Sequence, residues 1–280
     1  MTVWNQQVIR DLLVKKSKGM GVRLPQMQML LAQERFLARL YSLPEGKYFI
    51  WKGGSLLIRR YSSLEVPRYT VDIDLLLKGT DYKNTLGLLE KACKLNLEDG
   101  FEYSGIIAVT PMERETPYGG DGYEIQWTMF GKNQSAPLRI DVATGDVVDA
   151  DKSNFFDLAL LPEDGLHISA YVYPPEFIFA EKLETIFRFG TGNTRAKDLI
   201  DLWSLIKFGL DSNRLTKSIE DCFKNRKSEF SFTELQDILE DDFFIKNVER
   251  LFKAKFDYLN LPPVRVLTQE ILLYCEKITI

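Results

Sequence analysis

The chain has 280 residues, of which 45% are hydrophobic and 27% are charged, and its formal net charge is −4. These are ordinary globular values, so they exclude a disordered, fibrous or collagen-like chain. The cysteines are few, distant from one another and without CxxC spacing, which excludes a disulfide framework and a zinc site. They are Cys93, Cys222 and Cys275.

The N-terminus lacks the apolar run of a signal peptide, and no segment approaches 18 consecutive apolar residues. We therefore expect a cytoplasmic protein that does not enter a membrane. Residues 1–60 contain eleven Lys or Arg against three Asp or Glu, on a chain that is acidic as a whole. Such a basic segment indicates either a face that binds a polyanion or a solvated helix surface, and both readings stay open.

The first half of the chain predicts two helices and then a mixed sheet. Residues 6–41 have helical periodicity with an interruption near 19–25. Residues 48–54 predict a buried strand that ends in a glycine turn, and the helix 55–63 follows directly. A helix is expected at 81–96. Apolar or alternating runs predict the other strands at 69–77, 101–110, 122–130, 137–146 and 167–173.

The second half predicts helices only. Strong 3.6-residue periodicity marks 176–189 and 194–208, and further helical stretches, one with a capping box at Ser231 and Glu234, extend to the end. The fold class is therefore α+β: a mixed sheet flanked by helices, followed by a helical C-terminal region. We expect an α/β domain with N-terminal helices at 1–173 and a helical domain at 174–280.

Two acidic residues stand out in the strand at 69–77. Asp72 and Asp74 are two apart, so their carboxylates point to the same face, roughly 6.5–7 Å apart along the backbone. Their neighbours are apolar, and burying unpaired charge is costly. A bound Mg²⁺, or Mn²⁺ in its place, would relieve the repulsion between the two carboxylates. The alternative is an exposed pair on an edge strand.

A third acid is expected to complete this metal site. Asp141 alternates with Ile140 and Val142 in the strand at 137–146, so it faces the same side as the first pair if the two strands are neighbours. Asp146 and Asp149, in the following turn, are competing candidates.

The glycine turn indicates a phosphate site. Gly53 and Gly54 permit close approach of the backbone to an anion, and the N-terminus of the next helix offers free amides. Ser55 is expected to be the N-cap of that helix and to donate to a phosphate oxygen. The single histidine, His167, has no Ser or Cys motif beside it, which argues against a histidine-dependent nucleophile.

The glycine turn at Gly53-Gly54-Ser55 is followed by the strand with Asp72 and Asp74 and then by a third carboxylate, Asp141. In this combination of motifs the sequence resembles the DNA-polymerase-β-like nucleotidyltransferases. It is most similar to the AbiEii/MenT family of nucleotidyltransferase toxins. The similarity to the AbiEii/MenT family rests on Glu181-Lys182-Leu183 and on residues 195–202, RAKDLIDL. The part of the chain that resembles the family extends from about Trp51 to Trp203.

The motifs at 181–183 and 195–202 add charged residues to the candidate active site. Lys182 lies on an apolar helical face, where it either aims an ammonium into the active-site cleft or extends to solvent. Residues 195–202 form a charged ridge, in which Lys197 and Asp201 have the i, i+4 spacing of an ion pair. The resemblance implies that Lys182 contacts phosphate and that Asp198 or Asp201 has a functional role, in positioning either Lys182 or the nucleotide. Arg188 and Arg195 are expected to contact phosphate or RNA, or to be surface charge.

The predicted reaction is attack of a hydroxyl on the α-phosphorus of a nucleoside triphosphate, with release of pyrophosphate. The resemblance implies that the acceptor is RNA, at the 3′ end of a transfer RNA, that the helical domain completes the cleft, and that an antitoxin partner neutralises the toxin. Arg59, Arg60 and Arg68 are the basic residues expected nearest the site. A small-molecule transferase, of the antibiotic-modifying sort, and a protein-modifying transferase remain alternatives.

Overall fold

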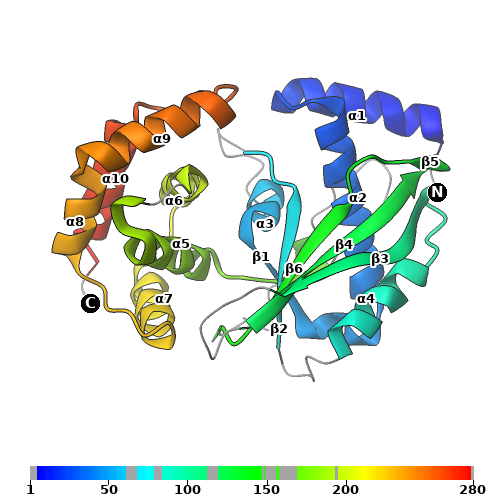
Figure 1. Ribbon diagram of the computed structural model, residues 1–280, viewed down its shortest axis with the longest axis horizontal. Coiled ribbons are helices and arrows are strands. Elements are labelled where there is room, and N and C mark those ends of the chain that lie inside the picture. The colour runs from blue at the N-terminus through cyan, green and yellow to red at the C-terminus, as the bar shows by residue number, and fades with distance from the viewer. Residues whose placement is uncertain are drawn as a thin grey trace. The chain divides into compact units, whose positions relative to one another are not determined.

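The protein is described by a computed structural model (Figure 1), in which two compact units are distinguished by their internal contacts. Unit 1 contains the described residues within the ranges 1–60, 69–146 and 150–172. Unit 2 contains Arg68, Val148 and the chain from Tyr173 onward. The structure describes residues 5–60, 68–78, 84–111, 119–146, 148, 156–157, 169–192 and 195–278.

Two helices open unit 1, as predicted: α1 (Gln6–Met20) and α2 (Leu24–Ser42). The Asn5 side chain caps α1 by accepting hydrogen bonds from the backbone N–H groups of the first turn. Gly21 ends α1 at φ 65°, in the left-handed region that glycine adopts without strain. No helix in the described ranges is long and apolar enough to cross a membrane.

Eight strands within the described residues form the predicted mixed sheet, in the order β3-β4-β6-β2-β1-β8-β7, with β5 beside β4. β2 is parallel to β6, and β1 is parallel to β8, whereas the other pairs are antiparallel. The strands are β1 (Phe49–Lys52), β2 (Asp72–Leu77), β3 (Phe101–Pro111), β4 (Gly119–Met129), β5 (Lys132–Asn133), β6 (Leu138–Thr144), β7 (Phe156–Asp157) and β8 (Ser169–Val172).

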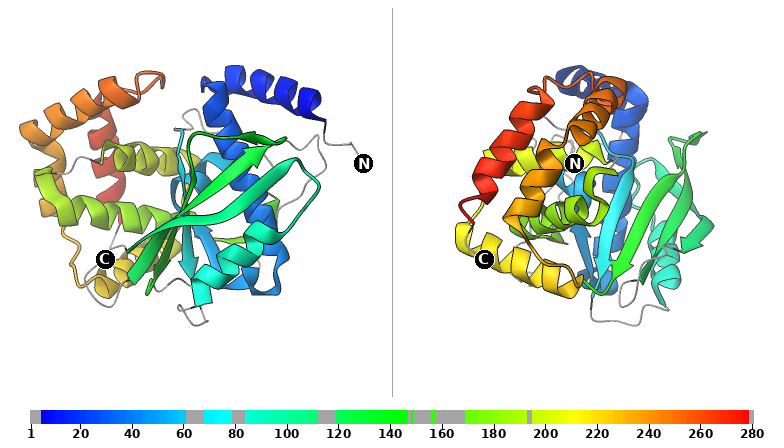
Figure 2. Two further views of the ribbon diagram at one scale, coloured as in Figure 1. Left: turned by 45° about the vertical axis from the view of Figure 1, so that its right-hand side comes forward. Right: turned by 60° about the vertical axis from the view of Figure 1, so that its left-hand side comes forward.

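One face of this sheet is apolar and is covered by helices. α2 packs against α4 (Thr85–Lys94), and both contact the sheet (Figure 2). Tyr103 of β3 packs edge-on against Phe36 of α2, with ring centroids 5.4 Å apart, and its hydroxyl donates to the Ala32 carbonyl at 2.6 Å. Alternate residues of the central strands line this face: Ile73, Leu75, Ile140, Val142, Tyr123, Ile125 and Trp127. Because side chains alternate along a strand, Asp72 and Asp74 lie on the opposite face.

Part of the basic excess of residues 1–60 lies in the interior. Arg39 is fully buried, and its guanidinium donates to both carboxylate oxygens of Asp99, at 2.9 and 2.7 Å. Lys52 is buried against Asp146, and Arg35 is buried as well. The basic face is therefore smaller than the sequence suggests, and its exposed members come mainly from α1 and the turn after it: Arg10, Lys15, Lys18 and Arg23.

Unit 2 consists of helices, as predicted. Pro175 opens the first of them, and Ser231 caps a later one by accepting from the Glu234 N–H at 3.3 Å. Phe187 and Phe223 pack edge-on in its core, with ring centroids 5.2 Å apart. The helices are α5 (Pro175–Phe189), α6 (Ala196–Phe208), α7 (Ser212–Asn225), α8 (Phe232–Glu240), α9 (Asp242–Lys255) and α10 (Val264–Cys275).

Candidate functional site

A row of four residues crosses the polar face of the sheet. Lys52 of β1 pairs in register with Asp74 of β2, Asp74 with Asp141 of β6, and Asp141 with Gly122 of β4. Register partners on neighbouring strands point to the same side and lie about 5 Å apart. The expectation that the strands of Asp74 and Asp141 are neighbours is thus correct, and their two carboxylates share one face.

Asp72 of β2 adds a third carboxylate to the face that carries Asp74 and Asp141. It is half-buried, like Asp74, and the fully buried Ile73 between them points the other way. Its register partner Arg139 donates to Glu124 at 3.0 Å. The polar face therefore carries three carboxylates from two adjacent strands, which are the oxygen ligands that Mg²⁺ prefers.

No three His, Cys, Asp or Glu side chains among the described residues converge as a metal centre. Like charges on adjacent positions repel one another, and a cation between them would relieve that repulsion. The row supplies the donor chemistry and the spacing for such an ion, and the ligand roles of Asp72, Asp74 and Asp141 stay a prediction.

Gly53 lies directly against the Asp74 carboxylate. Its φ is 70°, and a Cβ built on it would come within 2.0 Å of Asp74 Oδ2. It is also the first residue of α3 (Gly53–Arg60), with Gly54 in the same first turn. Glycine is thus required at position 53 on two counts, and it brings the free backbone amides of a helix N-terminus beside an acid of the DxD strand.

We expect Gly53→Ala to lower the free energy of unfolding by about 1–3 kcal/mol, because alanine is strained at this φ and its Cβ displaces Asp74. Urea denaturation measures the change. Gly19→Ala is the matched control, since Gly19 lies within α1 and a Cβ there meets nothing within 4 Å. That variant is expected to be slightly more stable than the wild type. Equal effects of the two substitutions would show that Gly53 is not constrained.

The predicted N-cap role of Ser55 is wrong. α3 already begins at Gly53, so Ser55 is the third residue of the helix. It is buried, and its Oγ accepts a hydrogen bond from the Trp51 indole at 2.7 Å. A hydroxyl that accepts one bond can still donate its own hydrogen, so the phosphate contact of Ser55 stays a prediction.

Lys52 is a residue of the row that the sequence analysis did not single out. Its Nζ lies 2.9 Å from Asp146 Oδ2, and both side chains are buried. Asp146, a competing metal ligand by sequence, is thus a partner of Lys52. The position of Lys52 directly before the glycine turn was the available signal, but nothing in the sequence linked residues 52 and 146. Asp149 and His167 lie outside the described residues.

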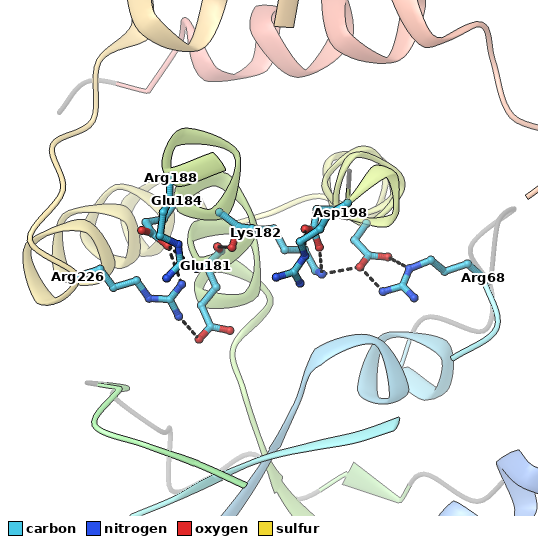
Figure 3. Close-up of polar contacts among 10 residues, drawn as sticks. Arg68, Glu181, Lys182, Glu184, Arg188, Asp198 and Arg226 are labelled. Carbon is cyan, nitrogen blue, oxygen red and sulfur yellow. Dashed lines mark hydrogen bonds and ion pairs between the residues drawn. The ribbon is translucent and has the colours of Figure 1, made fainter. Parts of the chain in front are cut away.

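Unit 2 contains a second charged cluster, centred on Lys182 of α5 (Figure 3). Lys182 is buried, and its Nζ lies 3.1 Å from Asp198 and 2.5 Å from Asp201, both on α6. Asp201 also accepts two hydrogen bonds from the Arg68 guanidinium, each of 2.6 Å. Lys182 does not extend to solvent, and both acids contact its ammonium.

The ionisation of the cluster follows from these contacts. Burial disfavours the charged form of Asp201, yet Arg68 and Lys182 outweigh that cost and lower the pKa of Asp201 to about 2. Burial likewise opposes the charge of Lys182, but Asp201 and Asp198 outweigh it and raise the pKa of Lys182. Both groups are therefore charged at neutral pH, and Lys182 is held as an ammonium.

The two other arginines predicted to contact phosphate or RNA, Arg188 and Arg195, belong to different groups of ion pairs. Arg195 lies 2.9 Å from Asp198 at the edge of the cluster, whereas Arg188 lies 3.7 Å from Glu184 and belongs to a separate group (Figure 3). That group joins α5 to the residue after α7, because Arg226 contacts Glu181 and Glu184 at 2.8 Å each.

Two of the arginines expected nearest the site are engaged inside the protein. Arg68 is buried against Asp201, and Arg59 donates to the Leu30 carbonyl of α2. A guanidinium that already serves an internal acceptor is poorly placed to contact a partner. The side chain of Arg60 lies outside the described part of the structure.

The sequence and the structure are similar to those of known nucleotidyltransferases. The family model described as "Nucleotidyl transferase AbiEii toxin, Type IV TA system" matches residues 35–265. Among solved structures, the chain is similar to JHP933 from Helicobacter pylori, with 17% identity over 89% of this chain and 94% of that one and a TM-score of 0.49. It is also similar to an antigenic nucleotidyltransferase-like protein from Paracoccidioides brasiliensis, with 14% identity over 86% and 93% of the two chains and a TM-score of 0.42. No curated protein matches.

Proposed function

The chain belongs to the AbiEii family of nucleotidyltransferase toxins of type IV toxin–antitoxin systems, and we propose that it transfers a nucleotide to RNA in a Mg²⁺-dependent reaction. The observation that carries the proposal is the row across the sheet: Asp74 and Asp141 in register, Asp72 on the same face, and Gly53 against Asp74.

We propose that these three carboxylates hold the metal. When bound, the ion would lower the pKa of the attacking hydroxyl and neutralise charge on the departing pyrophosphate. The amides of Gly53 and Gly54, at the N-terminus of α3, would donate to phosphate oxygens, and the Ser55 hydroxyl would add a donor from within the first turn. Mn²⁺ has similar ligand preferences and could replace Mg²⁺.

We propose further that the helical region 174–280 contributes Lys182 to the same reaction. Its ammonium would offset charge on the triphosphate, and Asp198 and Asp201 would hold it in place. Support comes from the buried, doubly paired geometry of Lys182, which keeps the group charged and restricts its position. Arg195, at the exposed edge of the cluster, would add a phosphate contact.

The proposed acceptor is the 3′ end of a transfer RNA, whose modification would stop aminoacylation and growth. The exposed basic side chains of α1 support an RNA substrate, because each phosphate contact releases counterions. Family membership implies an antitoxin partner. We propose that the reaction takes place in the cytoplasm, where transfer RNA is used.

The test is incubation of the purified chain with each α-labelled nucleoside triphosphate, Mg²⁺ and total RNA, followed by sizing of the labelled product. We expect label on RNA of transfer-RNA size. Label on a protein band would support a protein-modifying transferase instead, and label only on added small acceptors would support a small-molecule transferase. Label on RNA that persists at an undiminished rate in Asp74→Asn would contradict the proposed metal role of Asp74.

A further inference from the structure

Gly122 of β4 is the member of the row that has no side chain, and it lies beside Asp141 of β6. A glycine inside a strand is unfavourable, because it loses much conformational entropy on folding and packs no side chain. The backbone does not require glycine here, since the φ of Gly122 is outside the left-handed region. The strand would therefore accept a larger residue, and the neighbouring side chain accounts for the glycine.

The carboxylate of Asp141 takes the space that a side chain at position 122 would need. A Cβ built on Gly122 would lie 3.1 Å from Asp141 Oδ1, which is closer than a Cβ normally approaches another atom. Asp141 is half-buried, so its carboxylate is able to move. Alanine at position 122 would therefore displace the Asp141 carboxylate by a few tenths of an ångström.

The same relation holds at the other carboxylate of the row, Asp74, whose Oδ2 lies where a Cβ on Gly53 would be. Gly53 follows β1, and Gly122 belongs to β4, so the two glycines lie on opposite sides of the central pair β2 and β6. Each glycine leaves room for one carboxylate oxygen on the side away from the other acid. The spacing of the Asp74 and Asp141 carboxylates therefore depends on both glycines.

We propose that Gly122 is a positioning residue: it leaves the Asp141 carboxylate in the geometry that Mg²⁺ requires. This inference rests on the proposed function, in which Asp72, Asp74 and Asp141 hold the metal. Mg²⁺ demands near-ideal octahedral geometry with oxygens at about 2.0–2.1 Å, whereas Ca²⁺ accepts flexible geometry at about 2.3–2.6 Å. A small displacement of Asp141 therefore weakens the binding of Mg²⁺ more than the binding of Ca²⁺.

The test is displacement of Mn²⁺ from the full chain by Mg²⁺ or by Ca²⁺, followed by electron paramagnetic resonance. Gly122→Ala is expected to weaken Mg²⁺ binding by about tenfold, as changes beside a metal ligand do, and Ca²⁺ binding by less than about threefold. Gly119→Ala is the matched control, because Gly119 lies on the same strand and a Cβ there meets Thr144 Oγ1 at an ordinary 3.5 Å. It is expected to leave both affinities within about twofold of the wild type.

The free energy of unfolding separates positioning from a role in the fold alone. In urea, Gly122→Ala should stay within about 1 kcal/mol of the wild type, because alanine costs less conformational entropy in a strand than glycine does. Weaker Mg²⁺ binding would then not come from a damaged fold. Equal losses of Mg²⁺ and Ca²⁺ affinity, or an unchanged Mg²⁺ affinity, would overturn the proposal.

Asp141→Asn separates this inference from the proposed function. Adding Gly122→Ala to that variant is expected to cause no further loss of Mg²⁺ affinity, because the carboxylate that alanine displaces is already absent. Metal binding that Asp141→Asn leaves unchanged would refute the proposed metal role of Asp141. Metal binding that is lost in Asp141→Asn but unchanged in Gly122→Ala would keep that role and overturn only the role of Gly122.

Discussion

Asp74→Asn is expected to reduce nucleotide transfer by about a thousandfold or more, with the fold intact. Asparagine keeps the shape of the side chain but removes the negative charge that would bind the metal. Asp74 is the carboxylate in contact with the glycine turn and in register with Asp141, so no other acid described on this face can take over its position. The free energy of unfolding should stay the same or rise slightly, because carboxylate repulsion decreases.

Glu124→Gln is the matched control for Asp74→Asn. Glu124 lies on the same face of the sheet, but it pairs with Arg139 in a partly exposed ion pair. Its loss is expected to change the rate of transfer less than threefold and the free energy of unfolding by under about 1 kcal/mol. Rates are measured with labelled nucleotide, and folding is measured by urea denaturation. Comparable losses in both variants would mean that the polar face as a whole, and not the acidic group at Asp74, supports the reaction.

Asp201→Asn is expected to lower the free energy of unfolding by about 3–5 kcal/mol at neutral pH. The substitution leaves Arg68 and Lys182, both buried, with less negative charge, and a buried charge without its partner is costly. Asp237→Asn, which removes an exposed acid of α8, is the control and is expected to stay within about 0.5 kcal/mol of the wild type.

The same pair of variants gives a pH-dependent signature. The pKa of Asp201 is lowered in the folded protein to about 2, from a usual value of 3.8. Its stabilising contribution is therefore fully present above the unfolded pKa and is lost as the pH falls from about 4 toward 2. The stability difference between wild type and Asp201→Asn should be constant from pH 7 to 5 and shrink below pH 4. A difference that does not depend on pH would assign the effect to packing.

Local patterns were sufficient to predict most of the fold. Helical periodicity located α1, α2, α5 and α6, and apolar or alternating runs located six of the eight described strands, because these signals lie within a dozen consecutive residues. The two-residue strands β5 and β7 are too short to give such a signal. The glycine turn and the DxD strand could be joined into one site for a similar reason: strand alternation fixes which acids share a face. The helix start at Gly53, two residues before the expected cap, shows that helix boundaries are less well determined.

Long-range partners could not be read from the sequence. Lys52 and Asp146 are 94 positions apart, and Arg68 and Asp201 are 133 apart. The spacing of Lys197 and Asp201 predicted an ion pair, and this prediction is wrong, because Asp201 pairs with Arg68 and Lys182. Spacing along the sequence indicates which side chains can reach each other along a helix, whereas tertiary packing determines which ion pairs form. The basic excess of residues 1–60 was misleading for the same reason, because Arg39 and Lys52 have buried acidic partners.

The central claim, metal-dependent transfer at the carboxylates of β2 and β6, is tested most directly by a metal titration. Nucleotide transfer by the purified chain is measured after treatment with EDTA and again as Mg²⁺ is added back, in parallel with Asp74→Asn. We predict no transfer in EDTA, full recovery with saturating Mg²⁺ in the wild type, and no recovery in the variant. Transfer at an undiminished rate in EDTA, or equal recovery by the variant, would contradict it.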